Sequence, residues 1–540
     1  MDRKYVFVSG GVVSSLGKGI SAASLGRLLK SRGYKVSMQK LDPYYNVDPG
    51  LLSPLQHGET FVTEDGTCAD LDLGHYERIL DCNLSGKSSV TTGKIHKAIM
   101  EKELRGEYNG ATVQVIPHVT NEIIKQIKDA GEIANSEIAI IEIGGTVGDM
   151  ESSPYFEAVR QMKRNLPKDS CCFIHVTLLP FIEAAEELKT KPTQHSVKAL
   201  REIGIQPDII VCRSHIEIPA SAKDKIALFC NVKKDRVIEN LDADSIYEVS
   251  LLLEKEGFAD KVCDVLNIEK REPDLSDWLK FIDDKSKSIQ QIDVAIVGKY
   301  VELRDAYISC VEALHHSGYF NHINVNIHWV DSDHITESNY TTILQPYNGI
   351  LAPGGYGAKG TNGIILTAKY ARENNVPFMA IGLGMQLSVA EAARSFLGFK
   401  DANTLEADPN SKHPIAKVPE DRICQNDSRG AARLGSQEIE ILNHKLIEIY
   451  SKKTIYERHS NRYEIIRDFD DQFAKYGLKL AAVSNNNKFA EAYIIEEHPF
   501  YIITIYHSEY KSRPNKPHPL FNSFVKTIYS IKNNLPEAKS

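Results

Sequence analysis

Residues 10–19, GGVVSSLGKG, have the composition of a phosphate-binding loop. Glycines let backbone N–H groups approach phosphate oxygens, a following helix adds a favourable dipole, and Lys18 supplies a positive charge. The loop is not a strict Walker A motif, because five residues separate Gly11 from Gly17 and because Gly19 follows Lys18. We therefore predict a phosphate site between a strand and a helix, but the loop does not identify the nucleotide.

Two acidic residues further along the chain could hold Mg²⁺ beside such a loop. Asp72 lies in DLDLGHYER, and Glu142 closes the apolar run EIAIIEIGG. Mg²⁺ takes a few protein oxygens and leaves its other positions to phosphates and water. Asp65 and Asp70 lie nearby in the sequence, but we predict that they are solvated loop residues.

The stretch KTKPTQHS (189–196) could bind a nucleotide through its side chains. We expect Lys189 and Lys191 on one face of an extended segment, with Gln194 beyond a proline. Two ammonium groups and an amide suit a triphosphate and the edge of a base. The same residues are also typical of a solvated basic loop, so the stretch alone does not establish a nucleotide site.

The stretch PFMAIGLGMQLS (377–388) has the outline of a nucleophile elbow, in which a strand ends in a sharp turn and a helix follows. A reactive Cys or Ser belongs at the centre of that turn, but the residue there is Gly382. His507 and Glu509 in YHSEY have the spacing that places two side chains on one side of a strand. They could form a base and its orienting carboxylate, without a nucleophile.

These motifs require a particular set of elements around them. Short β-rich runs alternate with amphipathic helical segments, which predicts two doubly wound α/β domains. Ligands of such folds bind beyond the carboxyl ends of strands, where the motifs above fall. A polar stretch at 268–291 predicts a linker or connecting helix between domains at 1–267 and 292–540. The expected strands are residues 5–10, 35–42, 137–145, 170–180, 208–214, 294–298, 324–330, 348–355, 377–381, 490–497 and 500–510.

Composition excludes several classes of protein. The 540 residues are 42% hydrophobic and 25% charged with a net charge of −8, so we expect a cytoplasmic globular protein that binds neither nucleic acid nor membrane. Nine cysteines without a CxxC pair predict reduced thiols. Neither Cys310 nor Cys424, the two in the second domain, has an elbow around it, so we predict no substitute nucleophile.

Six motifs of the first half together resemble the synthetase domain of the CTP synthase family, in order and nearly without gaps. Members of that family phosphorylate O4 of UTP with Mg·ATP, and ammonia then displaces phosphate to give CTP, a step of pyrimidine biosynthesis. The resemblance implies an N-terminal P-loop-like synthetase domain, with ATP as co-substrate and Mg²⁺ as cofactor. The motifs are GGVVSSLGKG, KLDPYYNVDPG, DLDLGHYER, GATVQVIPH, EIGGTVGDMES and KTKPTQHS.

The resemblance also implies roles for single residues. Lys18 and Lys40 would neutralise charge on the transferred phosphoryl group, and Asp72 and Glu142 would hold Mg²⁺. CTP would inhibit by sharing the UTP triphosphate site. The family is homotetrameric, and Lys225 would reach the pyrimidine site from a neighbouring subunit. The implied nucleotide-binding residues are Ser14, Ser15, Leu16, Gly17, Lys18, Gly19, Ile20, Asp72, Asp149, Met150, Glu151, Lys189, Thr190, Lys191, Pro192, Thr193, Gln194, Lys225 and, at adenine, Leu241, Asp242 and Ala243.

The second half resembles a class I glutamine amidotransferase, which predicts a C-terminal domain of that type. That family attacks glutamine with a Cys thiolate and passes the ammonia to the synthetase domain, and GTP is implied as an allosteric activator. Its pattern G-x-C-x-G-x-Q corresponds here to residues 380–386, with Gly382 in place of the Cys. The implied catalytic pair is His507 and Glu509. The implied glutamine-binding residues are Gly355, Leu383, Gly384, Met385, Gln386, Glu406 and Arg462.

The missing Cys leaves three hypotheses. The main one is a ligase that makes CTP from UTP, ATP and free ammonia, with an inactive glutaminase half-reaction. The second is a glutamine-dependent enzyme whose Cys was replaced by design, and the third is a non-catalytic partner or sensor subunit. Several departures from the family pattern favour natural drift: Thr60, Asn109, Ala380, Ile505 and Ser508.

Overall fold

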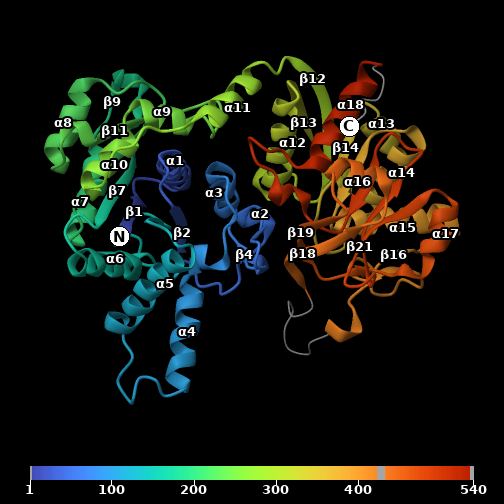
Figure 1. Cartoon of the computed structure of the whole chain (residues 1–540), viewed down its shortest axis with the longest axis horizontal. Coiled ribbons are helices and arrows are strands. Elements are labelled where there is room, and N and C mark those ends of the chain that lie inside the picture. The colour runs from blue at the N-terminus through green and yellow to red at the C-terminus, as the bar shows by residue number, and fades with distance from the viewer. Residues whose placement is uncertain (1–2, 423–431, 535–540) are drawn as a thin grey trace. The chain divides into compact units, whose positions relative to one another are not determined.

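The computed structural model describes residues 3–422 and 432–534, and its chain divides into two compact units. Unit 1 comprises Met1–Pro49 and Asp72–Ser276, and unit 2 comprises Gly50–Leu71 and Asp277–Ser540. Each unit is built on its own β-sheet with helices around it (Figure 1). The prediction of two α/β domains is therefore confirmed.

Unit 1 has a seven-stranded sheet in the order β11-β10-β7-β1-β6-β2-β5, and every neighbouring pair is parallel. All carboxyl ends therefore lie along one edge, where open α/β sheets bind ligands. The strands are β1 (Lys4–Gly10), β2 (Val36–Asp42), β5 (Ser89–Thr91), β6 (Ile138–Ile143), β7 (Cys171–Leu178), β10 (Ile209–Ser214) and β11 (Val237–Leu241).

Helices pack on this sheet through apolar side chains. Tyr5, Phe7 and Ile141 belong to one buried cluster with residues of α4, α5 and α6, whereas α1 packs against β1, β2 and β6. The strands β1 and β6 are mostly apolar and almost fully buried because they are covered in this way. The helices of unit 1 are α1 (Lys18–Ser31), α3 (Asp72–Leu80), α4 (Thr92–Leu104), α5 (Thr120–Ile133), α6 (Ser153–Asn165), α7 (Lys191–Glu202), α8 (Ala220–Cys230), α9 (Val249–Lys255) and α10 (Phe258–Leu266).

Unit 2 has a nine-stranded sheet in the order β13-β12-β14-β15-β23-β22-β21-β18-β19. The pairs from β13 to β23 are parallel, and the pairs from β23 to β19 are antiparallel. The strands are β12 (Gln290–Gly298), β13 (Ile323–Asp331), β14 (Gly349–Ala352), β15 (Phe378–Ile381), β18 (Arg433–Ile441), β19 (Thr454–Asn461), β21 (Leu478–Ser484), β22 (Phe489–Ile495) and β23 (Tyr501–Thr504).

Alternate residues of β12 face two different hydrophobic clusters, so helices cover both faces of this sheet. Ala295 and Val297 pack with α14, α15 and α17, whereas Val294 and Ile296 pack with α12, α16 and α18. Figure 1 shows α18 beside β12 and β14 in this unit. The helices are α2 (Pro54–His57), α11 (Ser276–Ser286), α12 (Ile308–Phe320), α13 (Tyr340–Leu344), α14 (Thr361–Asn374), α15 (Leu383–Leu397), α16 (His444–Tyr450), α17 (Asp470–Lys475) and α18 (Pro519–Lys532).

Two further predictions concern the whole chain. The eight cysteines among the described residues are all free, and Cys424 lies outside those residues. No helix in residues 3–422 and 432–534 combines the length and the apolar character that a membrane crossing needs.

Candidate active sites

The phosphate loop connects β1 to α1 at the carboxyl edge of the unit 1 sheet. It contains three residues with positive φ, Val12 (82°), Ser15 (55°) and Gly17 (81°), and Gly17 precedes the first helical residue, Lys18. Backbone N–H groups and the helix dipole are therefore available to an anion at this turn. The strand, loop and helix order expected from the sequence is present.

Lysine and carboxylate side chains lie together beside this loop. Lys18 Nζ donates to the carbonyl of Gly145 at 2.8 Å, and Lys40 at the end of β2 forms an ion pair with Asp72. Lys40 is only 7% exposed, so its charge acts in a poorly solvated place. Glu142 on β6 accepts a hydrogen bond from the hydroxyl of Tyr76.

The two predicted magnesium ligands border the same residue of α1. A carbon added to Gly19 would lie 3.2 Å from Glu142 Oε2 and 3.3 Å from Asp72 Oδ1, so the two carboxylates converge there. Burial raises the pKa of Glu142 against the opposing effect of Lys40, and a bound cation would favour its ionised form. Two carboxylates fit Mg²⁺ that takes its other ligands from phosphates and water. Among the described residues no group of three or more acidic, His or Cys side chains could form a complete metal cage.

The stretch 189–196 begins a helix instead of forming the extended segment we expected. Helix α7 starts at Lys191 with Pro192 in its first turn. Proline is tolerated there because N–H groups of the first turn have no acceptor within the helix. Gln194 Nε2 donates to Thr190 Oγ1 at 3.0 Å. Lys189 precedes the helix and pairs with Glu187 at 2.6 Å.

Most of the other implied nucleotide residues lie in loops that follow strands of this sheet. Asp149, Met150 and Glu151 follow β6, and Asp149 Oδ2 accepts from the backbone N–H of Thr146 at 2.7 Å. Met150 is 85% exposed. Leu241 ends β11, and the next residue, Asp242, pairs with Arg213 at 2.6 Å. Lys225 is an exposed residue of α8.

In unit 2, β15 and α15 form the predicted elbow, with Gly382 between them at φ 58° and ψ −115°. Only glycine adopts a positive φ without strain, and a side chain here would point at the neighbouring base. A carbon added to Gly382 would lie 3.2 Å from His507 Nε2. Ala380 lies in β15 and is not among the described residues with positive φ.

His507 and Glu509 form the predicted pair, but not on a strand. Strand β23 ends at Thr504, and a 3₁₀ turn at Ser508–Lys511 brings the two side chains together. His507 Nδ1 lies 2.7 Å from Glu509 Oε1, and the residues are 8% and 4% exposed. The carboxylate therefore orients the ring with Nε2 towards Gly382, as a general base requires.

A cavity of about 460 Å³ opens beside the elbow within unit 2. Its lining includes five of the implied glutamine-binding residues, together with Gly382 and His507. Gly384 packs closely on Ala352, and the side chain of Met385 belongs to the core. The five lining residues are Gly355, Leu383, Gln386, Glu406 and Arg462.

Lys299 is a buried residue of this site that sequence reasoning missed. It follows the end of β12 and donates to the carbonyls of Tyr356, at 3.1 Å, and Gly357. Burial lowers the pKa of Lys299 to about 8, whereas Glu406 opposes that shift. Glu406 Oε1 accepts from the backbone N–H of Gly357 at 2.8 Å, so both side chains hold the loop that contains Gly355. Its position directly after the predicted strand at 294–298 was the sequence signal that could have identified it.

Cys310 lines a smaller cavity with His507 and Glu509, but its thiol is poorly suited to replace the missing nucleophile. It is 2% exposed, and burial raises its pKa well above the usual range. The nucleophile of such reactions is the thiolate, which is not formed at so high a pKa.

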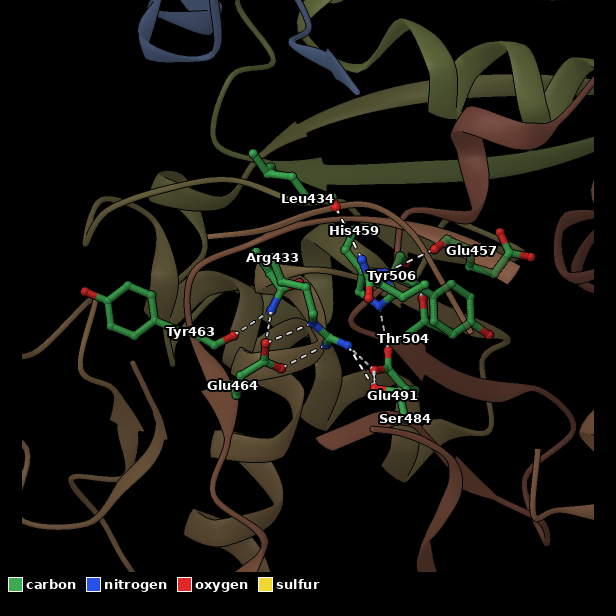
Figure 2. Close-up of polar contacts among 12 residues, drawn as sticks. Arg433, Leu434, Glu457, His459, Tyr463, Glu464, Ser484, Glu491, Thr504 and Tyr506 are labelled. Atoms are coloured by element: carbon green, nitrogen blue, oxygen red, sulfur yellow. Dashed lines mark hydrogen bonds and ion pairs between the residues drawn. The ribbon is translucent and has the colours of Figure 1, made fainter. Parts of the chain in front are cut away.

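A buried set of charged side chains stabilises the turn that carries Arg462, and we call it the Arg433 cluster: Arg433, His459, Glu464, Ser484 and Glu491 (Figure 2). Arg433 donates to both oxygens of Glu464, at 3.0 and 2.9 Å, and pairs with Glu491. Burial alone would raise the pKa of Glu491, but His459 at 2.7 Å and Arg433 lower it to about 2.

Asn461 connects this cluster to the turn between β19 and Glu464. Its Nδ2 donates to Glu464 Oε1 at 2.9 Å and to the carbonyl of Tyr463 at 3.0 Å. Because Arg462 lies between these residues, the cluster fixes the backbone from which its side chain extends.

Residues 50–71 belong to unit 2, although they come from the first half of the chain. Glu59 accepts hydrogen bonds from the hydroxyl and, at 3.3 Å, the N–H of Ser309; Glu64 pairs with Arg458 at 2.9 Å. The carbonyl of Thr60 accepts from Tyr510 at 3.0 Å. Residues 50–54 also line the cavity beside the elbow. The sequence prediction assigned all of these residues to the first domain.

Comparisons with known proteins match the two halves of the chain to two different families. Residues 4–268 match the family model described as CTP synthase N-terminus, and residues 302–527 match glutamine amidotransferase class-I. The chain is 51% identical over 533 residues to the CTP synthase of Clostridium kluyveri, covering 98% of this chain and 99% of that protein. It is 48% identical to the CTP synthase of Bacillus subtilis, covering 97% and 98%. A solved structure of the Trypanosoma brucei CTPS glutaminase domain with bound acivicin is similar, with 27% identity and a TM-score of 0.43, covering 46% of this chain and 96% of that one.

Proposed function

The chain belongs to the CTP synthase family, and we propose that it makes CTP with ammonia taken from solution instead of from glutamine. The observation that carries this proposal is Gly382, which stands at the centre of an intact elbow and faces His507 without any nucleophilic atom. Without a thiolate there is no acyl-enzyme route, so glutamine should not be hydrolysed at a useful rate.

The synthetase chemistry assigned here is a phosphoryl transfer followed by an amination. O4 of UTP attacks the terminal phosphorus of ATP, ADP leaves, and a 4-phosphorylated UTP results. Ammonia then attacks C4, and phosphate leaves to give CTP. Lys18 and Lys40 hold the charge of the transferred group, and their closeness to the phosphate loop supports these roles.

Asp72 and Glu142 would hold Mg²⁺, which supplies charge neutralisation for the phosphates when it is bound. The convergence of both carboxylates at Gly19 supports this assignment. Lys40 pairs with Asp72, so its ammonium group lies beside the proposed magnesium site.

The implied nucleotide residues of the carboxyl edge complete the proposal. Ser14 to Ile20 would hold phosphates, Asp149 to Glu151 and Lys189 to Gln194 would bind the pyrimidine nucleotide, and Leu241 to Ala243 would touch adenine. CTP would inhibit at the UTP triphosphate site. We extend to this chain the homotetramer of the family, with Lys225 contributed across subunits, and GTP as an activator.

Initial rates of CTP formation at fixed UTP and Mg·ATP test the proposal, once with ammonium chloride near pH 8 and once with glutamine. We expect turnover with ammonium and none with glutamine. Turnover with glutamine would contradict the missing-nucleophile argument, and the same assay on Cys310→Ala would show whether that thiol is responsible. No CTP from either source would favour a non-catalytic partner or sensor.

The retained pocket favours one alternative, a glutamine-dependent enzyme whose Cys was replaced by design. Glu406 and Arg462 still line the cavity, and His507 still pairs with Glu509. Under that alternative Gly382→Cys alone restores full glutamine-dependent CTP synthesis. Under natural drift, the departures at Ala380 and Asn109, and at Ile505 and Ser508 around His507, blunt that recovery.

A further inference from the structure

A buried chain of three polar side chains in unit 1 has no role in the function derived so far. Ser9 on β1 and His175 on β7 are directly paired in the sheet, and Ser9 Oγ lies 2.9 Å from His175 Nδ1. His175 Nε2 lies 2.8 Å from Ser196 Oγ on α7. The three residues are 3%, 0% and 6% exposed.

This chain reaches the phosphate loop through Gly11. A carbon added to Gly11 would lie 1.7 Å from Ser196 Oγ, so the hydroxyl occupies the space of the missing side chain. Gly11 N–H also donates to the carbonyl of Val176, the neighbour of His175, at 3.2 Å. The imidazole of His175 therefore contacts α7 on one side. On the other side it contacts β1, whose last residue, Gly10, is the first residue of the phosphate loop.

In its neutral form, which burial favours, the ring offers one N–H and one lone pair to the two hydroxyls. Ser9 Oγ lies 3.3 Å from the carbonyl of Ile174 and can donate there, so Nδ1–H donates to Ser9 and Nε2 accepts from Ser196. Burial, with a smaller effect of the Lys18 charge, lowers the pKa of His175 to about 3, which keeps the ring neutral.

We propose that His175 is a positioning residue that fixes the phosphate loop and the first turns of α7 relative to each other. The inference rests on the proposed nucleotide sites, because the loop is assigned to phosphates and the start of α7 to the pyrimidine nucleotide. The ring touches neither substrate. It acts by placing Gly11 on one side and Lys191 and Gln194 on the other in a single geometry.

Ser196→Ala removes the hydroxyl at the loop, and His175→Leu removes both contacts. A small misplacement of substrate-binding groups can cost up to about 100-fold in rate. We expect kcat/KM for UTP and for ATP to fall together by roughly 10- to 100-fold, whereas the KM for ammonia stays unchanged. His175→Gln should recover part of the loss, because an amide can bridge two hydroxyls.

The matched control is Thr177→Val. Thr177 lies two residues further along β7 and receives a hydrogen bond from Thr193 of α7 at 3.1 Å. It is as buried as His175, but the atoms nearest to the space beside Gly11 belong to Ser196 and Val147 and not to Thr177. If the contact between β7 and α7 has only a structural role, Thr177→Val should change kcat/KM as much as the other variants do. The thermal stabilities of all variants are measured so that a loss of folded protein is not taken for a kinetic effect.

The inference is supported if Ser196→Ala and His175→Leu lower kcat/KM for both nucleotides while Thr177→Val does not. It is overturned if Ser196→Ala behaves like the wild type or like Thr177→Val. If the wild-type protein makes no CTP from ammonia, the proposed function fails instead. Calorimetric titration of the same variants with UTP and with a non-hydrolysable ATP analogue then decides the positioning role, since equal dissociation constants in all variants would overturn it.

Discussion

Replacing Gly382 by Cys tests the missing-nucleophile argument directly. The added carbon would lie 3.2 Å from His507 Nε2 and 3.6 Å from Gly354 Cα, so the site can accept it with a shift of a few tenths of an ångström. The sulfur, one bond further out, starts within reach of the base. His507 is already oriented by Glu509, so no other group of the catalytic set needs to be introduced.

The size of the effect follows from what the thiol supplies. Loss of the nucleophile of a catalytic triad reduces kcat by about 10⁶-fold, and binding and oxyanion stabilisation retain about 10³-fold over water. We therefore expect Gly382→Cys to raise glutamine hydrolysis by on the order of 10⁴-fold or more. Gly382 has φ 58°, so any L side chain there introduces strain of about 1–3 kcal/mol. That strain lowers the melting temperature by about 2–4 °C for each kcal/mol.

Gly382→Ala is the control, because it has the same backbone strain without a thiol. Glutamate release from glutamine and thermal unfolding are measured for the wild type and both variants. We expect the two variants to share the stability loss and only the Cys variant to hydrolyse glutamine. The reasoning is refuted if calorimetry shows glutamine bound to a folded Gly382→Cys protein that still releases no glutamate, or if the wild type already hydrolyses it.

The remaining predictions concern other parts of the chain. Lys40→Met should reduce ammonia-dependent CTP formation by about 10²- to 10³-fold, because a buried charge aimed at the phosphoryl group is lost; steady-state rates with ammonium chloride check this. The pKa of His175 is about 3 in the folded state and near 6.5 when unfolded, so the unfolded chain binds the extra proton and the free energy of unfolding falls as the pH drops from 6.5 towards 3. Between pH 6.5 and pH 5 the free energy of unfolding should therefore fall by about 1–2 kcal/mol less in His175→Gln than in the wild type, as measured by urea unfolding. Glu464→Gln leaves buried Arg433 partly unpaired and should destabilise unit 2 by about 3 kcal/mol and weaken glutamine binding, whereas Glu438→Gln on the exposed face of β18 should do neither; calorimetry measures both effects.

The strands were predictable because parallel strands covered on both faces are continuous apolar runs. Residues 5–10, 137–145 and 208–214 show this pattern, and they correspond to β1, β6 and β10. The helical start of α7 was predictable from Pro192 in its first turn, but the two lysines drew the interpretation towards an extended loop. His507 and Glu509 were paired correctly from their spacing, although a 3₁₀ turn and not a strand joins them.

The position of residues 50–71 could not be predicted from local patterns. Their contacts with unit 2, such as Glu59 with Ser309, join residues 250 positions apart in the chain. Periodicity and turn signals describe neighbours in sequence, whereas these contacts depend on how two complete units fold. The Ser9–His175–Ser196 chain is similar, because each of its residues is an ordinary strand or helix residue until the fold brings them together.

The retention of His507 and Glu509 has a structural explanation that does not need glutaminase activity. Both are nearly buried and hydrogen-bonded to each other, so removing one would leave a buried polar group without its partner, at a cost of about 1–3 kcal/mol. Gly382 has the opposite property, because glycine removes the strain that a Cys with φ 58° would add. The fold therefore favours keeping the base and its carboxylate and favours losing the nucleophile. An intact dyad is thus weak evidence for glutamine hydrolysis, and the chemistry of the site depends on whether residue 382 supplies a thiol.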